Sequence, residues 1–380
     1  MNDAQYVQWI ISKVRPRAKF VNCDYKPHTG AQYLISKPLY YVSVYDESID
    51  SNVLSAPRAL IIVHNTYLES FAYNVLTCWL WAGRQPDFLR SEGRLYTLLR
   101  YNFKKFFAEQ FLRQRESLFA KALFLETLLF EQAAMARVGD EEEALPELRR
   151  SIRLGAKLMS SLVLGHELGH VVLQERPSEW DEVMRDHLHL KPVATRVEAN
   201  FLEQFVEDFR CDVMAIVGCM KEFENEFDVT SRLRLIAFGL CAFGVLLSLA
   251  ESAARTAAAQ TGNEEDVDLS AEFARYRGFE YTAFTNKDIS HRIACGLEVC
   301  EAIAKKEGVV LWGMNGAIPL PHESGEYLNR FMREFLEVED SNVRAMALRV
   351  AESLSGHDEG FEYLYRISKR YRYGEERWKV

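Results

Sequence analysis

The segment LPELRRSIRLGAKLMSSLVLGHELGHVVLQERP, residues 145–177, decides how this chain folds around its most informative motif. Pro146 suits the first turn of a helix, and Pro177 stops a helix shortly after the last apolar position. Between these prolines, apolar or small residues recur at helical spacing, at Leu158, Leu162, Gly165, Gly169 and Val172. The segment is therefore predicted to be a helix buried in a core.

The motif is HELGH, in which His166 and His170 enclose Glu167. Residues four apart on a helix lie one above the other, so both imidazoles can reach one ion. This spacing is typical of the ligand pair and general base of a zinc hydrolase. It predicts Zn²⁺ as the cofactor, with Glu167 as the base that activates water. The competing interpretation is a core helix that carries two histidines by chance, whose ring nitrogens would then need other partners.

A third ligand must come from another segment, because catalytic zinc takes three protein ligands and keeps one open position. Residues 200–218, NFLEQFVEDFRCDVMAIVG, have an apolar stripe at helical spacing and are predicted to form a second helix. Asp208, Cys211, Asp212 and Ala215 share one flank of that helix, where small side chains favour close approach to the HELGH helix. Asp208 is the candidate third ligand, and Asp212 the candidate partner of a ligand histidine.

HELGH followed by DFRCDVMA resembles the gluzincin metallopeptidases, whose second helix carries a Glu-x-x-x-Asp motif. The resemblance covers about residues 155–218, with a faint extension to 305, and implies that residue 208 is a zinc ligand and Asp212 its outer partner. The chain departs from the pattern because Asp208 stands where Glu is usual. Either the helices lie closer, or Glu207 supplies the oxygen instead. Helical geometry favours Asp208, since Glu207 points about 100° away.

A polar cluster further along extends the resemblance. Asp288, Ser290, His291 and Arg292 follow an apolar helix, and by analogy His291 or Arg292 would stabilise the oxyanion of the reaction. The alternative is that His291 is a loop or helix-cap residue, with Ser290 as the N-cap of a helix over residues 291–304.

The predicted fold class is mainly α with a small N-terminal β-containing region, an α+β fold built around a zincin-like helix pair. The strand signals are Leu39–Val44 and Ala59–His64, which are rich in β-branched or aromatic residues and bounded by turn residues. Helical patterns fill most of the remainder. The predicted organisation has a strand-containing region at 1–65, a helical region at 66–139, a catalytic core at 140–320 and a helical tail at 321–380.

Composition limits the partners and the compartment. The 380 residues are 48% hydrophobic, which is enough for a substantial core, and the formal net charge of −9 argues against nucleic-acid binding. Seven cysteines without a Cys-x-x-Cys pair, and the lack of a secretory signal, predict a protein of the reducing cytoplasm. The apolar run 235–250 is shorter than the roughly 20 residues that span a bilayer, so we expect a core helix, with membrane association as the alternative.

A second pair of histidines lies in RDHLH, residues 185–189. Since HELGH already supplies two ligands, His187 and His189 are expected to contact substrate or line the rim of the site, with metal binding as the alternative.

These features together predict a zinc metalloendopeptidase that hydrolyses a peptide bond in a protein or peptide substrate. The alternative is a regulatory or sensor protein that retains the zinc helix pair for structure and depends on a protein partner. A closed site with four ligands would favour that alternative, whereas an open fourth position favours an enzyme.

Overall fold

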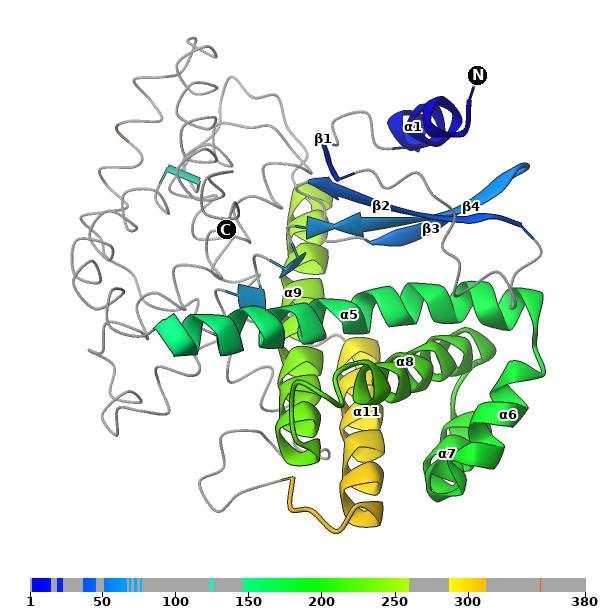
Figure 1. Ribbon diagram of the computed structural model, residues 1–380, viewed down its shortest axis with the longest axis vertical. Helices are drawn as coiled ribbons and strands as arrows, with labels where there is room; N and C mark the ends of the chain where they lie inside the picture. Colours follow the sequence, from blue (N-terminus) through cyan, green and yellow to red (C-terminus); the bar gives the residue numbers. More distant parts are fainter. Residues whose placement is uncertain are drawn as a thin grey trace. The chain divides into compact units, whose positions relative to one another are not determined.

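The computed structural model of the protein describes residues 2–14, 19–22, 37–45, 51–66, 146–259 and 287–311, with single positions at 68, 69, 72, 73, 76, 124, 125 and 349. Its elements are α1 (Asp3–Val14), β1 (Lys19–Asn22), β2 (Leu39–Tyr45), β3 (Asn52–Ala56), β4 (Ala59–Asn65), α5 (Pro146–Glu175), α6 (Glu179–Asp186), η3 (Leu188–Leu190), α7 (Lys191–Asn200), α8 (Glu203–Glu222), α9 (Val229–Ala259) and α11 (Lys287–Lys306) (Figure 1). The described part is mainly helical with one small sheet near the N-terminus, which confirms the predicted fold class.

The sheet has the strand order β1-β2-β4-β3. β2 and β4 run parallel at its centre, and the two outer strands are antiparallel to their neighbours. The central strands are the two that the sequence predicted, and both extend one residue beyond the predicted ends. β1 and β3 were not predicted, because strands of four and five residues with mixed polarity carry little periodic signal.

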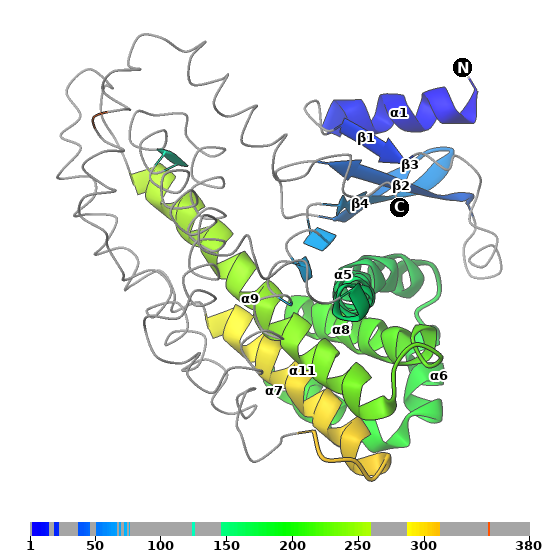
Figure 2. The same cartoon turned by 60° about the vertical axis from the view of Figure 1, so that its left-hand side comes forward.

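Each face of the sheet is covered by a helix (Figure 2). On one face, Val42, Ile61 and Val63 pack with Val7 and Ile11 of α1 in a buried cluster. The alternate residues of the central strands point to the other face. There Leu39, Leu60 and Ile62 form a second cluster with Val171 of α5, and Leu164 and Leu168 pack against it. The helix that carries HELGH is thus held against the sheet along the turns that contain the motif.

The helix α5 begins at Pro146 and ends at Glu175, in agreement with the two predicted boundaries. The predicted second helix is also present as α8, which begins at Glu203. The apolar run 235–250 lies within α9, where Leu235, Ile236 and Cys241 are buried. Among the helices that the structure describes, none combines the length and apolar composition required to cross a bilayer.

The chain divides into two compact units. One comprises Met1–Tyr73, Arg150–Gly244 and Lys287–Leu328, and it contains the sheet, α8, α11 and the HELGH motif. The other comprises Asn74–Arg149, Val245–Asn286 and Asn329–Val380. Most of the helical region predicted at 66–139, and nearly all of the tail predicted at 321–380, lies outside the described residues, so the four predicted regions stay a prediction.

Candidate metal centre

The helices α5 and α8 approach closely at two glycines. A Cβ atom placed on Gly165 would lie 2.9 Å from the Cα atom of Ala215, and one placed on Gly169 would lie 2.9 Å from the Cα atom of Cys211. Both distances are shorter than ordinary carbon contacts, so the absence of side chains at these glycines allows the helix spacing. The small-residue flank predicted from the sequence is therefore the contact surface, and it brings the histidine face of α5 within reach of α8.

Three side chains converge at this contact. The Nε2 atoms of His166 and His170 are 3.1 Å apart, and Asp208 Oδ1 lies 3.5 Å from Nε2 of His170 and 3.9 Å from Nε2 of His166. These atoms form a group that could hold a metal ion. Two ligands bound at 2.0–2.1 Å to a tetrahedral zinc ion lie about 3.3 Å from one another. The observed separations bracket that value, so the three residues are spaced as ligands of one tetrahedral metal ion would be.

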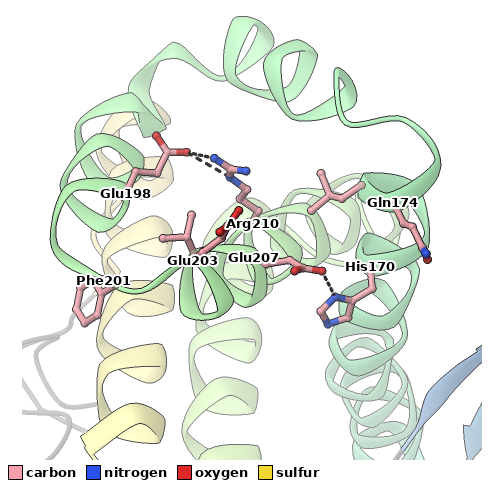
Figure 3. Close-up of a pocket in the computed structure, with 9 residues that line it drawn as sticks. His170, Gln174, Glu198, Phe201, Glu203, Glu207 and Arg210 are labelled. Atoms are coloured by element: carbon pink, nitrogen blue, oxygen red, sulfur yellow. Dashed lines mark hydrogen bonds and ion pairs between the residues drawn. The ribbon is translucent and has the colours of Figure 1, made fainter.

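The other nitrogen of each imidazole faces a carboxylate of α8. Asp212 Oδ1 is 2.8 Å from His166 Nδ1, which is the predicted contact between Asp212 and a ligand histidine. Glu207 Oε1 is 3.2 Å from His170 Nδ1 (Figure 3). The alternative third ligand, Glu207, therefore contacts the nitrogen of His170 that points away from the three-residue group. Sequence reasoning considered Glu207 only as an alternative metal ligand and did not predict this contact with the outer nitrogen of His170.

These contacts decide which nitrogen carries the proton on each ring. A carboxylate only accepts hydrogen bonds, so His166 and His170 each donate from Nδ1, to Asp212 and Glu207 respectively. In the neutral imidazole the remaining nitrogen, Nε2, then presents a lone pair. Two such lone pairs face each other across 3.1 Å, and this arrangement is favourable only when a proton or a cation lies between them.

Arg292 of α11 joins the two aspartates of α8. Its Nη2 donates to Asp212 Oδ1 at 2.9 Å and its Nε donates to Asp212 Oδ2 at 3.2 Å, while its Nη1 lies 3.6 Å from Asp208 Oδ2. The guanidinium group thus contacts both carboxylates, and its Nη2 also lies 3.4 Å from Nδ1 of His166. Arg292, one of the two residues predicted to contact the reacting oxyanion, therefore lies against the candidate metal-binding group.

Burial and charge act in opposite directions on these groups. Burial opposes the ionisation of Asp212, but the charge of Arg292 and the hydrogen bond with His166 hold the pKa of Asp212 below its ordinary value. Burial likewise opposes the protonation of His166, and the hydrogen bond and charge of Asp212 outweigh it, so the pKa of His166 is raised. Asp212 is therefore an anion that can hold the His166 ring in one tautomer.

Glu167 lies on α5 between the two histidines and is half-buried. Its charge is one of those that raise the pKa of His166, which places the carboxylate within electrostatic reach of the group. Its role as a general base stays a prediction.

His291, the other residue predicted to contact the oxyanion, lies beside Phe201. The His291 ring lies 5.3 Å from the ring of Phe201, in an edge-to-face arrangement, and is exposed. The alternative that Ser290 caps a helix beginning at His291 is wrong, because α11 begins at Lys287 and includes both residues. The predicted contact of His291 with the reacting oxyanion stays a prediction.

The second histidine pair lies at the end of α6 and in η3. The rings of His187 and His189 are 5.7 Å apart, and burial together with the charge of Lys306 lowers the pKa of each. Neither ring belongs to the metal-binding group found among the described residues. Their predicted role at the rim of the site stays a prediction.

Comparisons with protein-family models, with curated proteins and with solved structures found no match for this chain. The function of the site is therefore argued from its geometry.

Proposed function

We propose that this protein is a zinc-dependent metallopeptidase that hydrolyses a peptide bond in a protein or peptide substrate. The observation that carries the proposal is the pair of Nε2 atoms of His166 and His170, 3.1 Å apart, whose rings are each oriented by a carboxylate at Nδ1. Asp208 adds an anionic oxygen to the same point. The sequence resemblance to the gluzincins supports the same assignment, through HELGH and DFRCD.

His166, His170 and Asp208 would hold the ion. A zinc ion supplies Lewis acidity, which polarises a carbonyl group and lowers the pKa of water to about 7. The three residues are all that the described part of the chain contributes to the group. Three protein ligands are the number that catalytic zinc sites use, whereas structural sites use four. This count favours an enzyme over a protein that keeps zinc only for structure.

The remaining residues have roles that follow from their positions. Glu167 is the proton acceptor, because it lies on the helix turn between the ligands and can also return the proton to the leaving amine. Asp212 and Glu207 hold the two imidazole rings in the tautomer that leaves Nε2 free to bind a cation. Arg292 fixes Asp212 and Asp208 by donating hydrogen bonds to the first and by its charge on the second.

The test separates metal binding from catalysis. Glu167→Gln keeps all three proposed ligands, so it should bind one zinc per chain and lose cleavage by at least about 100-fold, as expected for a general base. His166→Ala should lose both. Zinc content would be measured by atomic emission, and cleavage by mass spectrometry of a mixed peptide library. Full cleavage by Glu167→Gln, or no zinc uptake by the wild-type protein, would overturn the proposal.

A further inference from the structure

A cavity of about 790 Å³ opens next to the proposed metal group, and His170 is part of its wall (Figure 3). The other lining residues come from the end of α5, the end of α7, the first half of α8, and Phe201 between α7 and α8. This volume is typical of pockets that bind small molecules or parts of a polymer. His170 is the one proposed ligand in this wall, so an occupant of the cavity would contact its ring.

Part of the wall is apolar. Leu173 of α5 and Val206 of α8 both line the cavity, and Val206 is 7% exposed. Phe201 adds an aromatic ring, which stacks on Phe205 at 4.3 Å between ring centres. An aliphatic chain that enters the cavity can therefore be removed from water against these side chains.

The charged part of the wall is predominantly negative. Glu198, Glu203 and Glu207 line the cavity together with one cation, Arg210. Arg210 is already neutralised, because its Nη2 and Nε donate to Glu198 Oε1 at 2.7 and 3.3 Å. It is therefore a poor binding site for a substrate carboxylate.

The unneutralised charge rests on Glu203 and Glu207. They are four residues apart on α8 and thus lie on one face of the helix in successive turns. The Oε1 atom of Glu207 accepts a hydrogen bond from His170, so its second carboxylate oxygen can accept a hydrogen bond from a ligand. Glu203 lies in the first turn, where the helix dipole favours its negative charge, and among the described residues no cation is paired with it.

We propose that this cavity is a specificity pocket that selects a lysine or arginine side chain of the substrate next to the scissile bond. Such a side chain has an aliphatic stem that suits Leu173 and Val206, and a cationic head that suits Glu203 and Glu207. The inference rests on the proposed function, because it assigns the residue that the peptidase prefers.

Cleavage of a mixed peptide library by the zinc-loaded protein gives the first test. Lysine and arginine should be enriched at one position beside the cleaved bond, and a peptide with lysine there should be cleaved with a kcat/KM about fivefold higher than its norleucine counterpart. Glu203→Lys should abolish the preference for basic residues, because the new cation offsets the charge of Glu207. Glu222→Lys changes an exposed glutamate at the far end of the same helix and should leave the preference unchanged.

Binding measurements separate the failure of this inference from failure of the proposed function. Fluorescein-labelled lysine and norleucine peptides would be titrated into zinc-loaded Glu167→Gln, with fluorescence anisotropy as the readout. Tighter binding of the lysine peptide by about fivefold, lost in the Glu167→Gln, Glu203→Lys double variant, supports the pocket even if the wild-type protein cleaves nothing. Cleavage or binding that does not distinguish lysine from norleucine overturns the pocket and leaves the peptidase proposal in place.

Discussion

The close contact between α5 and α8 predicts the effect of a single methyl group at Gly169. In Gly169→Ala the new Cβ would lie 2.9 Å from Cys211 Cα, 3.0 Å from its Cβ and 3.2 Å from its Sγ. Carbon atoms prefer a separation of about 3.5–4.0 Å, so α8 must move away by roughly 0.6–1 Å. The atoms in the way belong partly to backbone, so a side-chain rotation cannot relieve the clash.

The displacement has two measurable consequences. Asp208 lies three residues before Cys211 on α8 and should move with it, although a metal site tolerates only about 0.2 Å in its ligand distances. We expect zinc affinity to fall at least about tenfold, comparable to the loss of an outer hydrogen bond at a metal site. The overpacking should cost about 1–3 kcal/mol of the free energy of unfolding. The higher helix propensity of alanine offsets about 1 kcal/mol of this loss.

Gly218→Ala is the matched control. Gly218 lies on α8, and a Cβ atom there would meet no atom within 4 Å. The control should be unchanged in zinc affinity and more stable by about 0.5–1 kcal/mol. Urea unfolding of the metal-free proteins measures stability, and competition with a chromophoric chelator measures zinc affinity. The reasoning about the helix contact is refuted if Gly169→Ala is as stable as Gly218→Ala and binds zinc like the wild type.

Three further perturbations test the electrostatics of the fold and the site. Burial lowers the pKa of His64 to about 4, so the folded protein keeps this ring neutral and loses stability as the pH falls from the unfolded-state pKa of 6.5 through 4. The free energy of unfolding should fall by about 3 kcal/mol between pH 7.5 and 4. Urea unfolding of His64→Phe over the same pH range should lack that part of the loss. Asp212→Asn removes the anion that orients His166, so zinc affinity should fall about 10–100-fold, and an unchanged chelator competition would contradict this role. Arg292→Met leaves the mostly buried Asp212 without its cation, so the free energy of unfolding of the metal-free protein should fall by about 2–4 kcal/mol. An unfolding midpoint equal to that of the wild type would show that the ion pair is not stabilising.

Local periodicity was sufficient for several parts of the fold. The boundaries of α5 at Pro146 and before Pro177 follow from the conformational restriction of proline, and HELGH places two imidazoles on one face of any helix that contains it. The strands β2 and β4 could likewise be predicted, because runs of β-branched and aromatic residues between turn residues depend only on nearby sequence. Helical geometry favoured Asp208 over Glu207, and among the described residues Asp208 belongs to the group that could hold a metal ion.

The tertiary structure decided what the neighbouring helices contribute. Glu207 reaches His170 because α8 runs so close to α5 that an exposed side chain can still contact a ring on the other helix, and no spacing within α8 reveals that distance. Arg292 and His291 are adjacent in the sequence, yet only the first contacts Asp212, since successive residues of α11 point about 100° apart. The acidic cavity beside His170 is also a property of packing, because it is assembled from the ends of three helices. The sequence by itself determined which helix carries the two imidazoles, and the packing of α8 and α11 determined which charges surround them.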